Sequence, residues 1–247
     1  MDAYTSFAQV YDLFMDNVPY KEWAQRITDI LQENGIKEGI LLDLGCGTGK
    51  LTRLMEEKGF DMIGVDNSIE MLDMARENSK ENILYLLQDM REFELFGTVG
   101  AIYSACDSIN YILEEEELRE VFSLVNNYLD PNGIFIFDIN TKYKYEELLG
   151  ENTFAENREE GSFIWDNFYD REEQVNEYDL TLYIKEEKGR FVRFRETHYQ
   201  RCYTLETIKR ILEEAGLEYV ASYDDYSPES VREDSERILI VAREKGK

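Results

Sequence analysis

The chain has 247 residues, 43% of them hydrophobic and 13% aromatic, a composition typical of a globular domain and not of a disordered chain. Its 53 acidic and 27 basic residues give a formal net charge of −26, which argues against long nucleic acids and membrane surfaces as partners. Three dispersed cysteines argue against a disulfide framework or a metal site, and we find no signal peptide or membrane-spanning run, so we expect a cytoplasmic monomer or homodimer without a metal.

The first 34 or so residues predict a helical cap. Apolar residues recur at helical spacing in two runs separated by the helix breaker Pro19: Phe7, Val10, Tyr11 and Phe14, then Trp23, Ile27, Ile30 and Leu31. From residue 40 onward the pattern predicts alternating strands and helices. Strands are expected at 40–44, 61–66, 83–87, 99–104 and 134–138, helices at 48–58, 68–79 and 114–129, and a turn at 130–133. This order predicts an α/β fold with a mostly parallel sheet and helices on both faces.

The alternation stops between residues 141 and 203. Longer strands with polar turns are expected there, at 163–165, 178–185 and 190–203, which predicts an antiparallel β insertion. A helix over 204–215 and strands over 217–223 and 238–242 then resume the first pattern. We therefore expect one Rossmann-like domain from residues 1–140 and 204–247, with the insertion 141–203 over its site.

The strand at 40–44 leads into a glycine-rich loop. Gly45, Gly47 and Gly49 follow the acidic Asp43, and glycines allow a sharp turn and close approach of the backbone to a ligand. A dinucleotide fingerprint, G-x-G-x-x-G, requires glycine at position 50, where this chain has Lys50. A phosphate-binding P-loop requires Ser or Thr after the lysine, where this chain has Leu51.

The loop, with its preceding acid, resembles the first motif of the class I S-adenosylmethionine-dependent methyltransferases. The segments 7–23, which contains Tyr11–Asp12–x–x–Met15, 107–111 and 198–217 resemble a bacterial subgroup of that family with an N-terminal YDxxM helix and a β-rich insertion. The resemblance covers nearly the whole chain and implies S-adenosylmethionine as cofactor and S-adenosylhomocysteine as product. It also implies direct in-line methyl transfer, for which alignment of the reacting groups is the main requirement.

The resemblance implies a set of cofactor-binding residues. Asp66 would accept both ribose hydroxyls, Asp89 would bind the adenine amino group, and the backbone of residues 102–107 would lie under the methionine part. Without the evidence of the glycine-rich loop, Asp66 could equally be an acidic residue that favours the N-terminus of the following helix, and Asp89 could be an ordinary loop residue. The expected cofactor set is Tyr11, Trp23, Asp43, Gly45, Cys46, Gly47, Thr48, Gly49, Asp66, Asn67, Met71, Gln88, Asp89, Met90 and Cys106.

The candidates for catalysis are Tyr11, Asp107, Asn110, Tyr111 and His198. Tyr11 would be a lid beside the sulfonium, or simply a core residue of its helix. Asp107, Asn110 and Tyr111 follow the fourth strand, at the edge where open α/β sheets bind ligands. Tyrosine is a weak base at neutral pH, and His198, the only histidine, is either the base or a strand residue without a catalytic role.

Arg193 and Arg195 share the strand face opposite His198, and would bind an anionic substrate or pair with acidic residues. The leading function is a methyltransferase for a small molecule. The alternatives are a methyltransferase for RNA or protein, which a basic groove around residues 190–201 would favour, and a non-catalytic S-adenosylmethionine-binding protein. An NAD-dependent oxidoreductase is disfavoured by the glycine spacing.

Overall fold

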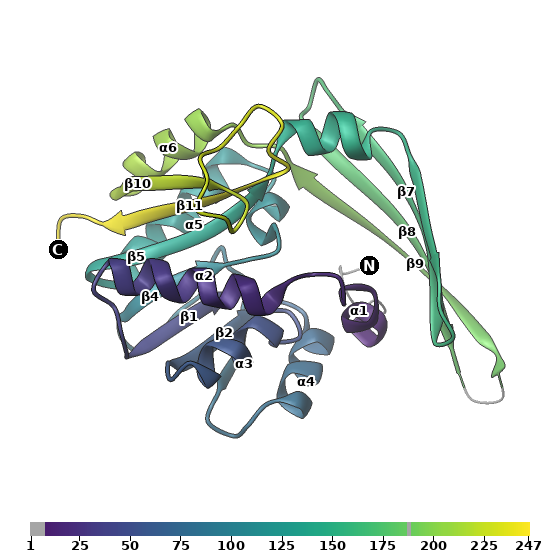
Figure 1. Ribbon diagram of the computed structural model, residues 1–247, viewed down its shortest axis with the longest axis horizontal. Coiled ribbons are helices and arrows are strands. Elements are labelled where there is room, and N and C mark those ends of the chain that lie inside the picture. The colour runs from purple at the N-terminus through teal and green to yellow at the C-terminus, as the bar shows by residue number, and fades with distance from the viewer. Residues whose placement is uncertain (1–7, 187–188) are drawn as a thin grey trace.

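The computed structural model describes residues 8–186 and 189–247 and has a seven-stranded sheet at its centre (Figure 1). The strand order is β10-β11-β5-β4-β1-β2-β3. The strands are β1 (Ile40–Leu44), β2 (Asp61–Asp66), β3 (Leu84–Leu87), β4 (Val99–Ser104), β5 (Leu129–Asn140), β10 (Leu217–Asp224) and β11 (Arg237–Glu244). Strands β1 to β5 pair in parallel, and β11 is antiparallel to both of its neighbours. The predicted mostly parallel sheet is therefore confirmed.

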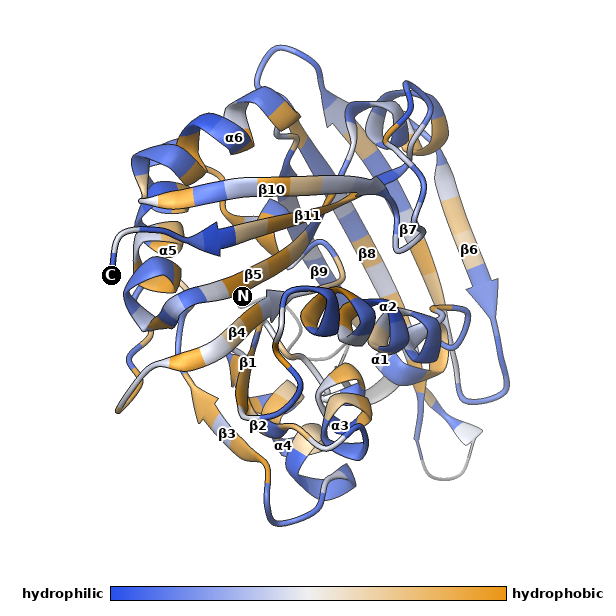
Figure 2. Cartoon of the chain, turned by 60° about the vertical axis from the view of Figure 1, so that its left-hand side comes forward, coloured by the Kyte–Doolittle hydropathy of each residue, from blue (hydrophilic) through white to orange (hydrophobic). Residues whose placement is uncertain are grey.

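Helices cover both faces of this sheet, as expected. One face carries α2 (Tyr20–Glu33), α3 (Lys50–Glu57) and α4 (Ile69–Asn78), and the other carries α5 (Glu115–Tyr128) and α6 (Leu205–Glu214). Alternate residues of one strand therefore enter different cores: Leu41 packs with the first group and Leu42 with the second. Burial on both faces explains the continuous apolar strands, which Figure 2 colours orange.

A four-stranded antiparallel sheet stands beside the central sheet (Figure 1). It contains β6 (Thr153–Asn157), β7 (Gly161–Asp170), β8 (Val175–Lys185) and β9 (Phe191–Arg201), preceded by the π-helical segment η2 (Lys144–Leu149). The sequence predicted neither β6 nor η2, and it predicted only a short part of β7. Strand β6 lies at the sheet edge, where its residues alternate between exposed and half-buried, so it has no apolar run to reveal it.

Helix α1 (Ala8–Phe14) joins the two parts of the molecule. Phe14 packs edge-on against Phe163 of β7 at 4.9 Å between ring centroids, and Arg158 donates to the Leu13 carbonyl at 2.5 Å. On its other side, the Asp12 carboxylate accepts a hydrogen bond of 2.8 Å from the Thr48 hydroxyl in the glycine loop. The helix is thereby held between the loop and the four-stranded sheet.

The link between α5 and β5 differs from the expected turn. Strand β5 begins at Leu129, directly after the helix, and the chain bends inside the strand at Asn132, whose φ is +62°. Asparagine tolerates this left-handed conformation better than most residues. Among the described helices, none is both long and apolar enough to span a membrane.

Candidate functional site

The glycine loop turns through left-handed backbone between β1 and α3. Gly45, Gly47 and Gly49 have φ values of +82°, +53° and +70°, a region that disfavours other residues. A Cβ on Gly45 would lie 2.9 Å from the Ser108 side chain, whereas a Cβ on Gly47 would meet no atom within 4 Å. The loop therefore packs tightly at Gly45 and presents open backbone at Gly47.

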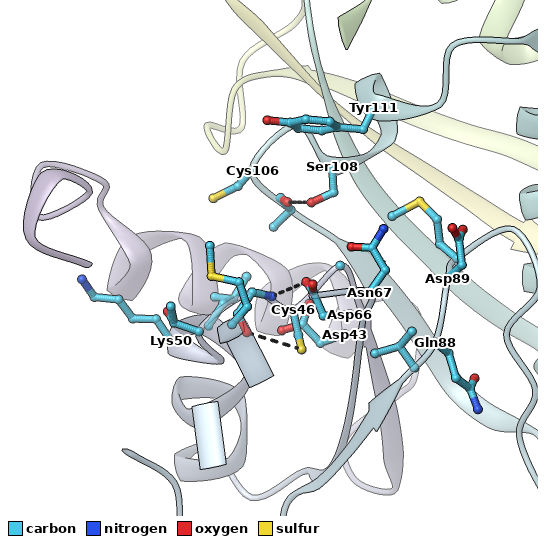
Figure 3. A pocket seen from close by; sticks show the side chains of 18 of the residues that line it. Asp43, Cys46, Lys50, Asp66, Asn67, Gln88, Asp89, Cys106, Ser108 and Tyr111 are labelled. Atoms are coloured by element: carbon cyan, nitrogen blue, oxygen red, sulfur yellow. Dashed lines mark hydrogen bonds between the residues drawn. The ribbon is translucent and has the colours of Figure 1, made fainter. Parts of the chain in front are cut away.

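A cavity of about 240 Å³ opens beside this loop, at the carboxyl edge of the parallel strands (Figure 3). Among the described residues it is lined by every expected cofactor residue except Trp23 and Gly49. These are Tyr11, Asp43, Gly45, Cys46, Gly47, Thr48, Asp66, Asn67, Met71, Gln88, Asp89, Met90 and Cys106. Of the catalytic candidates, only Tyr11 and Tyr111 line it. The lining residues that sequence reasoning missed are Tyr20, Lys50, Leu51, Val65, Arg91, Ala105, Ser108 and Ile112.

Asp66 ends β2 with a half-buried carboxylate at the cavity. One oxygen accepts the Gly47 N–H at 2.8 Å and the other accepts the Ser68 N–H at 2.9 Å. Burial raises the pKa of Asp66, and these backbone hydrogen bonds oppose the rise. The carboxylate therefore holds the loop backbone and also lines the cavity. The Ser68 side chain caps α4 by accepting a hydrogen bond of 3.2 Å from the Met71 N–H.

Replacing Gly47 with alanine tests the open approach of the loop backbone. We expect about a tenfold or greater loss of affinity for S-adenosylmethionine, because a methyl group would occupy the side from which the ligand approaches. Gly35 is a matched control, since it also has positive φ, +85°, and open space around its Cβ position, but lies outside the cavity. Gly35→Ala should show similar backbone strain with unchanged affinity in titration calorimetry. Equal affinities for both variants would contradict this account of the loop.

Asp43 lies beneath the loop and is 2% exposed. Its Oδ2 accepts hydrogen bonds from the Thr52 hydroxyl at 2.6 Å and from the Tyr103 hydroxyl at 3.0 Å. Burial raises the pKa of Asp43 to about 7, although both hydroxyls oppose the rise. The residue borders the cavity, but its oxygen is used to hold β1, α3 and β4 together.

The raised pKa of Asp43 predicts a pH-dependent stability. Between the ordinary pKa of an aspartate and pH 7, the folded state retains a proton that the unfolded state has lost, so the free energy of unfolding falls as pH rises. Asp43→Asn cannot titrate, and its amide oxygen can still accept from both hydroxyls. In urea titrations the wild type should lose stability relative to Asp43→Asn between pH 5 and pH 8. A constant difference between the two proteins would refute this.

Asp89 follows β3 and is oriented by a residue the sequence did not indicate. Its carboxylate accepts Arg91 Nη2 at 2.6 Å and Arg91 Nε at 2.9 Å. This hydrogen bonding by Arg91 lowers the pKa of Asp89 and keeps it ionised at the cavity wall. Met90, between them, supplies an apolar surface to the cavity.

The backbone after β4 is strained. Cys106 and Asp107 are consecutive non-glycine residues with φ of +58° and +53°, and such conformations concentrate at functional sites. Burial raises the pKa of Cys106 to about 12, so its thiol stays protonated at neutral pH. The Asp107 N–H donates to the Asp138 carboxylate at 3.0 Å, which helps to hold this turn.

Asp107 lies behind the cavity and not on its wall. One carboxylate oxygen accepts from Arg237 at 2.7 Å and the other from Gln200 at 2.6 Å. Burial alone would raise the pKa of Asp107, but Arg237, Lys144 and Gln200 together lower it. Asp107 was expected among the catalytic residues at the ligand-binding edge of the sheet. Instead, its ion-paired carboxylate connects the central sheet to β9 and is not part of the cavity wall.

Asn110 and Trp23 are also displaced from their expected positions. Asn110 is fully buried, donating to the Arg201 carbonyl at 2.8 Å and accepting from the Asn140 N–H at 3.0 Å, so it braces the two sheets. Trp23 lines a second pocket, and its ring stacks on that of Tyr226 with 4.3 Å between the ring centroids. On α2 it is Tyr20, one helical turn earlier, that reaches the cofactor cavity. Gly49 instead begins α3 as its N-cap residue.

His198 contacts Tyr111 from the buried face of β9, which we call its inner face. The Tyr111 hydroxyl is 3.4 Å from His198 Nδ1, and the histidine is 5% exposed. Arg193 and Arg195 lie on the opposite, exposed face, as their alternation predicted. Arg195 is paired with Asp179 there. Residues 8–186 and 189–247 contain no group of three metal-ligating side chains.

Together these features define an α/β protein that binds an adenosine-type cofactor at the carboxyl edge of a parallel sheet. Residues 41–133 match the family described as "Methyltransferase domain". The chain is 35% identical over 243 residues to "Putative methyltransferase YqeM" of Bacillus subtilis (strain 168), covering 97% of this chain and 96% of that protein. It superposes on a crystal structure of an S-adenosylmethionine-dependent methyltransferase from Clostridium acetobutylicum with a TM-score of 0.87 and 30% identity, covering 99% and 100% of the two chains.

The chain therefore belongs to the class I S-adenosylmethionine-dependent methyltransferases, an enzyme family with S-adenosylmethionine as cofactor. The cavity suits that molecule chemically: Asp66 and Asp89 offer acceptors for hydroxyl and amino groups, Gly47 offers open backbone, and Tyr11 and Tyr20 offer aromatic rings. A weaker likeness, 30% over 133 residues, covers 53% of this chain and 56% of dTDP-3-amino-3,4,6-trideoxy-alpha-D-glucopyranose N,N-dimethyltransferase of Streptomyces venezuelae.

Proposed function

We propose that this methyltransferase acts on a small-molecule acceptor by direct in-line transfer. When bound, S-adenosylmethionine supplies an electrophilic methyl group on a cationic sulfur. Asp66 would hold the ribose hydroxyls and Asp89 the adenine amino group. Tyr11 and Tyr20 would place aromatic rings near the cation, which favours it electrostatically. Alignment and exclusion of water are then the main tasks of the protein.

The proposal rests on a set of hydrogen bonds that connects the four-stranded sheet to the central sheet. Gln200 of β9 binds Asp107, Asn110 binds the Arg201 carbonyl, and Arg201 donates to the Leu113 carbonyl at 2.8 Å. These hydrogen bonds tie β9 to the segment that follows β4, and we infer that the inner face of the four-stranded sheet covers the carboxyl edge of the central sheet. Such a covered site suits a compact acceptor better than a polymer. We take residues 141–203 as the part of the chain that covers the acceptor.

The arrangement of basic residues disfavours the RNA alternative. Arg193 and Arg195 are exposed on the outer face of β9, away from the cavity, and Arg195 is paired with Asp179. Arg201 points its guanidinium at a backbone carbonyl. With a net charge of −26, the chain offers no basic groove among these residues for a phosphate backbone.

Acceptor screening tests this proposal. The enzyme is incubated with S-adenosylmethionine and separate sets of amines, hydroxyl compounds, carboxylates, total RNA and unfolded proteins, and S-adenosylhomocysteine release is measured. We expect turnover only in a small-molecule set. The partial likeness to an amino-sugar N,N-dimethyltransferase supports giving the amine set priority. Turnover with RNA or protein alone would contradict the proposal.

A further inference from the structure

Three residues form a chain of contacts that leads from the cofactor cavity into the four-stranded sheet. Tyr111 ends the short helix η1 (Ser108–Tyr111) and lines the cavity, on the far side from the glycine loop in Figure 3. Its hydroxyl lies 3.4 Å from His198 Nδ1, and the two rings meet edge to face with their centroids 6.0 Å apart. Glu196 Oε2 lies 3.3 Å from His198 Nε2.

Glu196 places a buried carboxylate within ion-pair distance of His198 Nε2. Glu196 and His198 are two residues apart on β9, so both side chains point to the inner face, where they are 2% and 4% exposed. A buried carboxylate beside Nε2 favours the tautomer that carries its proton on Nε2. Nδ1 then has a lone pair directed toward the Tyr111 hydroxyl, which can donate to it.

Other ionisable groups near Tyr111 and His198 make hydrogen bonds or ion pairs with other partners. Both Asp107 oxygens accept from Gln200 and Arg237. The Tyr178 hydroxyl, next to His198 across the β8–β9 pair, donates to Gln200 Oε1 at 2.6 Å. The Cys106 thiol is 3.7 Å from the Tyr20 hydroxyl. Tyr111 and His198 thus connect the cavity to an imidazole nitrogen.

We propose that Tyr111 and His198 form a proton path that takes the proton released by an amine acceptor, with Glu196 as the positioning residue. This rests on the proposed function. As the amine nitrogen bonds to the methyl group, the C–S electron pair passes to sulfur and the nitrogen becomes an ammonium. The ammonium proton moves to Tyr111 Oη while the Tyr111 proton moves to His198 Nδ1. The imidazolium formed faces the Glu196 carboxylate and later releases its proton to solvent.

The path suits an acceptor that releases a proton about as acidic as that of an alkylammonium group, such as a primary or secondary amine. A neutral imidazole can take a proton from an alkylammonium group, whereas an aliphatic hydroxyl is too weakly acidic for it. A carboxylate acceptor has no proton to release and would not need the path. Tyr111 is the catalytic residue, because it lines the cavity, and His198 acts through it.

Because the chain has one histidine, His198 can be observed directly by ¹⁵N NMR in tag-free protein labelled at histidine. With S-adenosylhomocysteine bound, the neutral ring should carry its proton on Nε2, and Tyr111→Phe should shift the Nδ1 resonance. Glu196→Gln should move the population toward the Nδ1–H tautomer. Tyr199→Phe and Glu177→Gln, on the outer face of the sheet, are matched controls that should leave the ring unchanged. A proton on Nδ1, or no response to Tyr111→Phe, would overturn the proposal.

Measurements of kcat distinguish a failure of the proton path from a failure of the proposed methyltransferase function. With the amine found by screening, Tyr111→Phe and His198→Gln should each lower kcat by about a hundredfold or more. For His198→Gln, whose side chain does not line the cavity, calorimetric affinity for S-adenosylmethionine should stay within a factor of two of wild type. If the variants bind the cofactor and keep full kcat, the path is wrong and the methyltransferase function stands. If no small molecule is methylated, the proposed function itself has failed.

Discussion

Asp66→Ala is expected to weaken binding of S-adenosylmethionine by about ten- to hundredfold, or roughly 1.5–3 kcal/mol. The carboxylate lies at the cavity and also accepts the Gly47 and Ser68 N–H groups. Its removal would therefore delete the acceptor for the ribose hydroxyls and leave the loop backbone less well held. Both effects act on the same ligand and should add to a large loss measured by titration calorimetry.

A control at the other end of the same strand separates binding from folding. Asp61 begins β2 and is exposed, whereas Asp66 ends it at the cavity. Asp61→Ala should therefore bind the cofactor as the wild type does. Thermal unfolding followed by circular dichroism shows whether both variants are folded. A folded Asp66→Ala protein with wild-type affinity would remove Asp66 from the cofactor site.

Arg237→Met is expected to destabilise the protein by about 3–5 kcal/mol. The Arg237 guanidinium lies between Asp107 and Asp138; the Arg237 side chain is 13% exposed and that of Asp138 is 0% exposed. Burial raises the pKa of Asp138, and Arg237 opposes that rise, so removing the guanidinium leaves two carboxylates buried together. The loss should be largest at pH 8 and smaller at pH 5, because protonation of either carboxyl group relieves the repulsion.

Arg232→Met is the matched control for this substitution. Its guanidinium also pairs with several acids, among them Asp224 and Asp234, but its side chain is 53% exposed. An exposed ion pair of this kind contributes about 0–1 kcal/mol. Urea titrations of both variants at pH 5 and pH 8 measure the contrast. Similar midpoints for Arg237→Met and Arg232→Met would show that the buried cluster does not hold β4, β5 and β11 together.

Most of the expected cofactor residues line one cavity, and this grouping could be predicted because those residues follow local rules. Gly47 and Asp66 each come at the end of a parallel strand, and parallel strands place their carboxyl ends at one edge of the sheet. Arg91 and Tyr20 were missed although they lie within the same segments. Arg91 reaches the cavity because it forms a bidentate pair with Asp89, and Tyr20 does so because that side of α2 faces the cavity. No rule of sequence spacing specifies either contact.

The positions of the catalytic candidates were predicted less well, because they depend on contacts between distant segments. Asp107 and Asn110 follow a strand as expected, but Arg237, Gln200 and Arg201, about 90 to 130 residues later, draw them away from the cavity. Glu196 was missed because one glutamate among 53 acidic residues has no distinguishing signal. Its significance appears only when β9 is placed with that face inward beside η1.

Titration calorimetry of the wild-type protein with S-adenosylmethionine, S-adenosylhomocysteine and NAD tests the central claim most directly. The cavity beside Gly47, Asp66 and Asp89 should bind both sulfur compounds at micromolar concentrations and should not bind NAD. Binding of NAD with no binding of either sulfur compound would contradict the assignment of this site.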